Sequence, residues 1–320
     1  MPIGVPKTVR DAAKRLLPEV AAGRLRSTVL RRYYVESLIS NEGRTKRFLR
    51  RTFTSRRPTL FHLDVHVTDH CNLNCRGCEH YSSISEPAFA DLDRTVGELE
   101  RLAELFDGIE QIYLLGGEPL LHPRVAEFVR ETRRIFPRTR LYVMTNGVLV
   151  TRMPESFWDA LHDADTTLLC DSYPINVPHD VIDRLGREHG VVVEWMKPAE
   201  EFFKIPLDRS ASSDPAASFD RCRGLSNCAI VRDGRLFPCA HVAYADIPAG
   251  KFGLPDIEPC EQDSISIFGD ANGDEIVDFL MSPVPWCARC DFDSFERYPW
   301  SRGTGEASEW LKSPPEAMQP

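Results

Sequence analysis

The sequence predicts an α/β fold in which parallel strands, joined by helical crossovers, close or partly close into a barrel. Three observations predict it. Short apolar strands alternate with amphipathic helices between residues 59 and 205, polar or glycine-rich turns follow several of the strands, and beyond residue 206 the pattern changes to a cysteine-bearing hairpin. Repeated strand–helix units favour parallel strands. We expect a helical extension over 1–58, the barrel over 59–205, a linker with a small cysteine-rich domain over 206–300, and a flexible tail over 301–320.

Residues 1–58 read as a basic helical segment outside the barrel. Residues 8–22 and 28–40 carry apolar side chains at helical spacing. Residues 1–60 hold 15 Lys and Arg against 4 Asp and Glu, although the whole chain of 320 residues has a net charge of −9. A basic arm can contact nucleic acid or a phosphorylated substrate. No nucleic-acid-binding module accompanies it, so we expect no nucleic acid partner.

Cellular location is predicted from what the sequence contains and lacks. No run approaches the roughly 18 apolar residues of a membrane span, and the first residues lack the apolar centre of a signal peptide. The ten cysteines stand in clustered spacings, which favours metal ligation over disulfides. We expect a cytoplasmic protein with no membrane partner.

Within the barrel region the elements alternate regularly. Helices are expected over 93–106, 124–136, 154–164 and 181–190, and strands over 61–68, 111–117, 141–147, 166–174 and 191–195. Functional groups of such barrels gather at the carboxyl ends of the strands. Four segments fall there: the cysteine loop that follows residue 68, GGEP at 116–119, TNG at 145–147, and DSYP at 171–174.

The cysteine loop, TDHCNLNCRGCEHY, holds Cys71, Cys75 and Cys78 within eight positions. A structural zinc site takes four ligands, and in ordinary ferredoxins each iron of a 4Fe–4S cluster has its own cysteine. Three cysteines leave one iron without a protein ligand, which is where a small molecule can bind. The alternative is a zinc knuckle completed by His70 or His80.

The run C-N-L-N-C-R-G-C fits C-x3-C-x2-C and resembles the signature of the radical S-adenosylmethionine (SAM) superfamily. The resemblance implies a partial (β/α)6 TIM-type barrel, a 4Fe–4S cluster on the three cysteines, and SAM chelated to the open iron. It also implies a 5′-deoxyadenosyl radical that removes a hydrogen atom from the substrate, and a reductant of the flavodoxin or ferredoxin type. The family usually has an aromatic residue before the last cysteine, where this chain has Gly77.

Two further strand ends complete the expected SAM site. Gly116 and Gly117 let backbone approach a ligand closely, and Glu118 can accept a hydrogen bond from an ammonium group. By resemblance this is the site of the SAM amino group. Thr145 and Asn146 of the TNG turn resemble a second SAM-contacting strand end, although Asn-Gly is also a common turn dipeptide.

A second cysteine set follows the barrel. Asp233 and Gly234 stand at the centre of a two-residue hairpin turn, which pairs Ile230 with Phe237. The same register places Cys228 opposite Cys239, with Cβ atoms roughly 4.5–5.5 Å apart. The arrangement resembles a twitch domain, the shortened form of the SPASM domain, and implies a second 4Fe–4S cluster. A zinc ribbon is the alternative. Hairpin geometry favours Cys228 and family spacing admits Cys222, so five cysteines compete for four places: Cys222, Cys228, Cys239, Cys287 and Cys290.

Two cysteines lie outside both sets. Cys170 closes a predicted strand, where we expect its sulfur to face the reaction chamber; a thiol there can return a hydrogen atom to a substrate radical. A buried apolar cysteine is the alternative interpretation. Cys260, in a loop, is the rival donor. Substrate-binding carboxylates are expected among Asp171, Glu194 and Asp220.

The segments GCEHYSS, LLGGEPLLHP and DSYPI resemble radical SAM proteins of glycan and aminoglycoside biosynthesis. This resemblance implies hydrogen-atom abstraction from a carbinol carbon of a sugar or aminocyclitol. We expect epimerisation with a cysteine hydrogen donor. The alternatives are dehydrogenation of the same substrates through the auxiliary cluster, modification of a peptide, and a non-catalytic protein that only binds metal.

Overall fold

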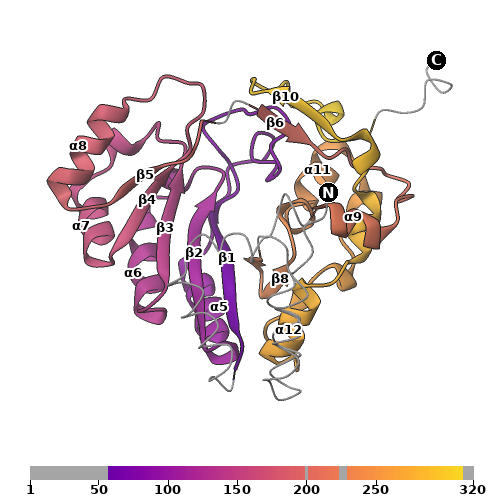
Figure 1. The fold of residues 1–320 in the computed structure, drawn as a ribbon, viewed down its shortest axis with the longest axis horizontal. Helices are drawn as coiled ribbons and strands as arrows, with labels where there is room; N and C mark the ends of the chain where they lie inside the picture. The colour runs from indigo at the N-terminus through magenta and orange to yellow at the C-terminus, as the bar shows by residue number, and fades with distance from the viewer. Residues whose placement is uncertain (1–56, 199–200, 223–228, 313–320) are drawn as a thin grey trace, which may run out of the picture.

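An eight-stranded, mostly parallel sheet organises the residues that the computed structural model describes, namely 57–198, 201–222 and 229–312. The strand order is β5-β4-β3-β2-β1-β7-β8-β9. Figure 1 shows the run from β5 to β1, with β8 beyond β1. Neighbours from β5 to β7 pair in parallel, and β8 and β9 add antiparallel strands at one edge. The predicted α/β class with a parallel, partly closed sheet is confirmed. The helical extension predicted for 1–58 lies outside the described residues up to residue 56.

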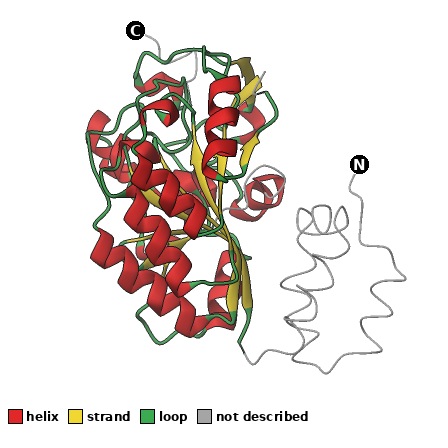
Figure 2. Ribbon diagram, turned by 90° about the vertical axis from the view of Figure 1, so that its left-hand side faces the viewer, coloured by secondary structure: helices red, strands yellow, loops and turns green. Residues whose placement is uncertain are grey.

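Strands and helices alternate along the first half of the sheet. The strands are β1 Thr59–Thr68, β2 Gly108–Gly116, β3 Arg140–Thr145, β4 Thr166–Cys170 and β5 Val193–Trp195. The connecting helices are α5 Leu92–Leu105, α6 Val125–Ile135, α7 Glu155–Asp163 and α8 His179–His189. The helices cover one face of the sheet (Figure 2).

The helix-covered face of the sheet forms the first hydrophobic core. Successive residues of a strand point to opposite faces, and Leu63, Val65 and Val67 of β1 pack in this core with Leu99 and Leu102 of α5. The start of α5 is set by Asp91, whose carboxylate accepts the Arg94 N–H at 2.8 Å, a typical N-cap. The opposite face of β1 presents Asp64 and His66 to the interior of the partial barrel.

The predicted hairpin forms β7 Ile230–Arg232 and β8 Arg235–Phe237, with Ile230 opposite Phe237 as expected. Asp233 and Gly234 take φ values of 50° and 73°, which a two-residue hairpin turn requires. β7 pairs in parallel with β1, so the hairpin belongs to the central sheet. Its Val231 side chain packs in the first core, whereas Ile230 packs in a second.

The second hydrophobic core is formed mainly by residues of the C-terminal half of the chain. Its helices include α9 Pro215–Cys222, α10 Ala240–Ala243 and α11 Asp246–Phe252, while α12 Gly273–Leu280 and strand β9 Ile265–Ser266 pack toward the first core. A separate two-stranded ribbon pairs β6 Glu201–Lys204 with β10 Glu296–Pro299 near the strand ends of the main sheet (Figure 1). Helix α9 lies within residues 206–300, where the sequence predicts a linker with a small cysteine-rich domain.

The prediction of a flexible tail from residue 301 is wrong for residues 301–312. They belong to a packed segment, residues 298–312, here called the C-terminal strap. Trp310 is 3% exposed and packs in the second core. Its carbonyl accepts the Leu207 N–H at 2.8 Å, and the Lys312 N–H donates to the Leu207 carbonyl at 3.0 Å. Two large apolar side chains, Trp310 and Leu311, therefore hold the strap down; residues 313–320 lie outside the described part.

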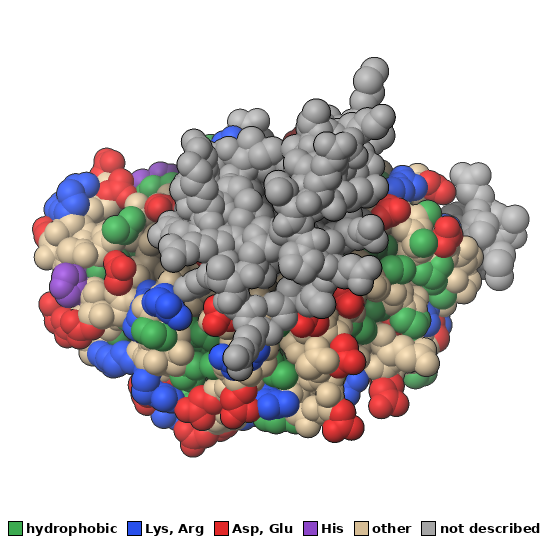
Figure 3. Space-filling model, turned by 60° about the horizontal axis from the view of Figure 1, so that its bottom comes forward, with side chains coloured by type: hydrophobic (Ala, Val, Ile, Leu, Met, Phe, Trp, Pro, Cys, Tyr) green, Lys and Arg blue, Asp and Glu red, His purple; other side chains and the backbone are tan. Residues whose placement is uncertain are grey.

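Polar and charged side chains of both signs are interspersed on the surface seen in Figure 3. Among the described helices, none combines the length and the apolar character needed to cross a bilayer.

Candidate functional site

The three loop cysteines line one cavity. Cys71, Cys75 and Cys78 lie in the connection that leaves the carboxyl end of β1, and all three face a cavity of about 350 Å³, here called the strand-end cavity. Burial is the main cause that raises the pKa of Cys71 to about 12 and of Cys75 to about 11. Both side chains are therefore neutral thiols until a metal displaces their protons.

The glycine pair after β2 holds the cysteine loop against β1. A Cβ at Gly116 would meet the Thr68 carbonyl, and one at Gly117 the His70 carbonyl, well inside the 3.0 Å that such atoms keep. The Gly117 N–H donates to the Thr68 carbonyl at 2.9 Å. The sequence interpretation assigned this close approach to a ligand. In the structure the two glycines approach the backbone at the end of β1, and both also line the cavity.

Glu118 does not lie where the sequence interpretation places it. Its side chain is fully buried and does not line the strand-end cavity. Oε1 accepts the Thr145 hydroxyl at 2.7 Å and the Leu120 N–H at 3.0 Å, and Oε2 accepts the Asn146 N–H at 2.9 Å. Burial raises the pKa of Glu118 to about 7 against the lowering effect of these hydrogen bonds. The structure thus gives this carboxylate the role of tying the ends of β2 and β3 together.

The TNG turn reaches the cysteine loop. Thr145 and Asn146 both line the cavity. The Asn146 side-chain amide donates to Asn72 Oδ1 at 2.7 Å and lies 3.7 Å from the Cys71 sulfur. The turn therefore adds two polar residues to the lining of the cavity, and the Asn146 amide reaches the Cys71 sulfur.

A carboxylate and a phenol complete the wall at the end of β4. Asp171 and Tyr173 line the cavity, and the Tyr173 hydroxyl donates to Asp171 Oδ2 at 3.3 Å. Burial raises the pKa of Asp171 to about 6 although the Tyr173 hydrogen bond lowers it. Phe202 of β6 stacks on Tyr173 with ring centroids 5.8 Å apart. This corner joins an acid–base group to an aromatic wall.

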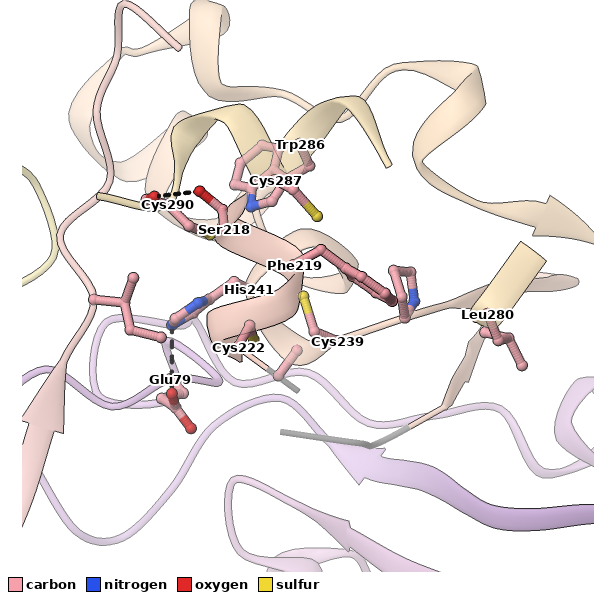
Figure 4. Close-up of a pocket in the computed structure, with 13 residues that line it drawn as sticks. Glu79, Ser218, Phe219, Cys222, Cys239, His241, Leu280, Trp286, Cys287 and Cys290 are labelled. Carbon is pink, nitrogen blue, oxygen red and sulfur yellow. Dashed lines mark hydrogen bonds and ion pairs between the residues drawn. The ribbon is translucent and has the colours of Figure 1, made fainter. Parts of the chain in front are cut away.

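Four cysteines converge on a second, smaller cavity, the cysteine pocket shown in Figure 4. Cys222 ends α9, Cys239 follows β8, and Cys287 and Cys290 belong to a 3-10 turn at Pro285–Arg289 and to its C-cap. Burial raises the pKa of all four thiols. Cys228 lies outside the described residues, so the competition between Cys222 and Cys228 stays open, with Cys222 placed at the pocket.

Glu79 lies on the wall between the two cavities. It follows Cys78 directly and lines both the strand-end cavity and the cysteine pocket. Its side chain is 39% exposed, and Oε1 lies 3.9 Å from His241 Nε2 of the pocket (Figure 4). One carboxylate therefore connects the two cysteine sets.

Comparison with known families identifies the segment that contains the cysteine loop. Residues 65–185 match the family model described as the Radical SAM superfamily. This segment belongs to the radical SAM superfamily. It contains the cysteine loop, the glycine pair, the TNG turn and Asp171.

The radical SAM segment also resembles curated proteins over part of their length. A GTP 3′,8-cyclase of Streptomyces coelicolor is 29% identical over 178 residues, which are 54% of this chain and 51% of that protein. Molybdenum cofactor biosynthesis protein 1 of Bos taurus is 34% identical over 94 residues, which are 29% of this chain and 15% of that protein. The chain spans about half the length, or less, of the curated relatives it matches.

A solved structure of BtrN in complex with AdoMet and 2-DOIA is similar with a TM-score of 0.44 and 18% identity, covering 80% of this chain and 100% of that one.

The side chains of the radical SAM segment fit an iron–sulfur cluster. Three thiols line one cavity beside backbone and polar side chains from three strand ends, which matches a cluster with one open iron. Within 57–198, 201–222 and 229–312, no three His, Cys, Asp or Glu side chains are arranged to hold a single metal ion. A cubane cluster binds each cysteine through a different iron, so its three ligands need not converge on one ion.

Both predicted hydrogen donors lie away from the strand-end cavity. Cys170 is fully buried and packs in the first core beside Leu168, on the helix-covered face of β4. The expectation that its sulfur faces the chamber is wrong, because the strand presents Asp171, and not Cys170, to that side. Cys260 is exposed and caps a 3-10 turn, Glu261–Asp263, outside both cavities.

Of the three carboxylates expected to bind substrate, the structure places only Asp171 in the cavity. Glu194 and Asp220 are exposed and line neither cavity. Sequence reasoning missed Glu79, whose position directly after the last loop cysteine was the available signal. It also missed Phe202 and Phe203, because nothing local in EFFK indicates which cavity a strand so far along the chain would reach.

Proposed function

We propose that this protein is a radical SAM enzyme that oxidises a carbinol carbon of an amine-bearing, polyhydroxylated substrate such as an aminocyclitol or amino sugar. The observation that carries the substrate class is the charge of the strand-end cavity. Among the described residues that line it are the carboxylates Glu79, Asp171 and Glu201, and none is Lys or Arg. SAM itself carries one net positive charge, so it would not neutralise all three carboxylates. The remaining negative charge favours a cationic substrate.

The chain supplies the positions that this chemistry needs. A 4Fe–4S cluster held by Cys71, Cys75 and Cys78 would bind SAM at its open iron and supply the electron that releases a 5′-deoxyadenosyl radical. Gly117 and Asn146 line the cavity beside these cysteines and support a SAM site there. Phe202 and Tyr173 close one side with aromatic rings, which favours exclusion of water from a reactive intermediate.

Oxidation of a carbinol carbon to a ketone removes a hydrogen atom, a proton and an electron. Asp171 supports the proton transfer, because its carboxylate faces the cavity, has a raised pKa of about 6, and shares a hydrogen bond with the Tyr173 hydroxyl. The cysteine pocket would hold a second 4Fe–4S cluster as the one-electron acceptor. Glu79, on the wall common to both cavities, supports a substrate position between them.

Dehydrogenation is preferred to epimerisation because of where the spare thiols lie. Inversion needs a group that returns a hydrogen atom to the opposite face of the carbon. Cys170 is enclosed in the first core and Cys260 lies on the surface, so neither is placed to do so. Modification of a peptide and metal binding without catalysis have no comparable support in the charge of the cavity.

The cyclase relatives favour a second candidate, a reaction on GTP. A nucleoside triphosphate carries several negative charges, which usually face Arg, Lys or a helix N-terminus. The acidic lining of the strand-end cavity argues against it, and the assay can include GTP directly.

The experiment is anaerobic turnover of reconstituted protein with SAM and dithionite, using aminocyclitols, amino sugars, the corresponding neutral polyols, and GTP. We expect substrate-dependent 5′-deoxyadenosine with an amine-bearing polyol and a product that has lost two hydrogens. A product of unchanged mass with one deuterium from deuterated water would establish epimerisation instead. Turnover of GTP alone would overturn the assigned substrate class, and 5′-deoxyadenosine from no condition would overturn the enzyme assignment.

A further inference from the structure

The C-terminal strap, residues 298–312, pairs directly with the cysteine loop. The Arg76 N–H donates to the Ser301 carbonyl at 3.0 Å, and the Gly303 N–H donates to the Asn74 carbonyl at 2.8 Å. The Asn74 side-chain amide returns a hydrogen bond to the Gly303 carbonyl at 2.9 Å. Contacts more than 220 positions apart in sequence thus give the cysteine loop the pairing of a β-bridge.

A buried carboxylate fixes the strap to the centre of the cysteine loop. Glu309 is 6% exposed, and its Oε2 accepts the Gly77 N–H at 3.1 Å. Its Oε1 accepts the Thr304 hydroxyl at 2.8 Å and the Gly305 N–H at 2.9 Å, and also the Thr304 N–H. Because every donor but one comes from the strap itself, Glu309 orders the strap and the cysteine loop together.

The strap also accounts for the glycine at position 77, where the radical SAM family usually has an aromatic residue. Gly77 has a φ of 62°, and a Cβ there would stand 2.5 Å from the Tyr298 hydroxyl. That hydroxyl donates to the Arg76 carbonyl at 3.1 Å. The space beside position 77 is therefore filled by a side chain of β10. A larger residue at position 77 would have to displace the Tyr298 hydroxyl and adopt a positive φ that L side chains rarely take.

Two tryptophans of the strap donate to the cysteine loop, but to different kinds of acceptor. The Trp310 indole N–H donates to the Cys78 carbonyl at 2.9 Å. The Trp300 indole N–H donates to the Cys75 sulfur itself at 3.2 Å. Only the second bond touches an atom that would bind iron.

We propose that the C-terminal strap is part of the cluster site, and that Trp300, through its N–H bond to the Cys75 sulfur, raises the reduction potential of the cluster held by the loop. Trp300 is a positioning residue in this scheme. A hydrogen bond to a ligand sulfur stabilises the additional negative charge of the reduced cluster, and such bonds are among the determinants of iron–sulfur potentials. The inference rests on the proposed cluster at Cys71, Cys75 and Cys78.

The test compares Trp300→Phe with Trp310→Phe, which each remove one indole N–H and keep an aromatic ring. Both are made in a background with Cys239→Ser and Cys287→Ser, so that the loop cluster is measured alone. The readout is the midpoint potential from an anaerobic redox titration followed by electron paramagnetic resonance, with iron content measured in parallel. Trp300→His, which retains an N–H, is the rescue variant.

We expect a lower midpoint potential in W300F, a wild-type value in W310F, and a value between wild type and W300F in W300H. A W300F potential equal to that of the background protein, or an equal shift in W310F, would overturn the inference. Loss of iron in both W300F and W300H while W310F stays loaded would also overturn it, since a donated N–H would then not be the determinant. A background protein that holds no cluster would instead refute the proposed function.

Discussion

Replacement of Glu118 by Gln distinguishes a structural carboxylate from a SAM ligand. In the amide the oxygen can keep the Thr145 hydroxyl and the Leu120 N–H as donors, in the position of Oε1. The NH₂ group then faces the Asn146 N–H, which now donates to Oε2 at 2.9 Å. The change therefore replaces an acceptor by a donor at a fully buried position.

The expected cost follows from that single reversal. Burial raises the pKa of Glu118 to about 7, so at pH 8 the wild type carries the cost of a buried charge that E118Q would remove. The comparison is therefore made at pH 5, where both side chains are neutral and only the hydrogen-bond reversal differs. A buried donor left without its acceptor costs roughly 1–3 kcal/mol, so we expect E118Q to lower the free energy of unfolding by about that amount. With a urea m-value of about 3 kcal/mol/M, the midpoint falls by about 0.3–1 M.

The assay is urea unfolding of the metal-free protein at pH 5, with SAM affinity of the reconstituted protein measured by calorimetry. Glu127→Gln is the matched control, because Glu127 is an exposed carboxylate paired with Arg124 at 2.7 Å, and exposed ion pairs contribute little to stability. We expect its urea midpoint to stay close to that of the wild type. An E118Q protein that unfolds at the wild-type urea concentration but binds SAM weakly would refute the structural role and restore the ammonium interpretation.

Two further predictions concern the two sites, and a third concerns the buried carboxylate Asp208. Gly117→Ala places a Cβ against the His70 carbonyl, so the cysteine loop must move; we expect lower iron content and a lower unfolding temperature, and a protein with wild-type values of both would contradict this. Cys239→Ser should reduce iron from about eight to about four per chain while the three loop cysteines still support SAM cleavage, as iron analysis and 5′-deoxyadenosine release can show. Burial alone would raise the pKa of Asp208, but hydrogen bonds from Ser210 and Ser212 and the nearby Lys312 ammonium hold it well below 3.8. Its stabilising contribution is therefore complete above pH 3.8 and is lost as the pH falls, so Asp208→Asn should flatten the decline in unfolding free energy between about pH 5 and pH 2, and an unchanged decline would count against it.

Local sequence patterns predicted those parts of the structure that depend on residues close together in the chain. Apolar alternation located β1 and a buried apolar run located β2. The Asp233–Gly234 dipeptide set the hairpin register, because only a turn with positive φ at both residues joins strands that closely. The spacing of Cys71, Cys75 and Cys78 likewise predicted that all three thiols would meet at one site.

The orientation of Cys170 could not be predicted in the same way. β4 reads TTLLC, with Leu168, Leu169 and Cys170 all buried. A strand covered on both faces lacks the alternation of polar and apolar residues that identifies its inner face. The side that Cys170 faces becomes evident only from the residues with which it packs.

Contacts between distant segments were also beyond local patterns. Glu309 and Trp300 act on a loop more than 220 positions earlier in the chain, and nothing within GTGEASEW indicates a partner. A short polar segment near the end of a chain has the composition of a tail, and its two tryptophans are the only local sign of packing. The burial of Trp310 requires the second core to be in place.

The parallel pairing of β7 with β1 limits how the chain can be divided. Cutting it after residue 205 would leave one side of β1 with unpaired N–H and C=O groups, along a strand whose Val65 and Val67 are almost completely buried in the intact protein. An open, apolar strand edge is a template for intermolecular association. A barrel fragment expressed without its cysteine-bearing hairpin should therefore aggregate, and the two halves are best treated as one folding unit.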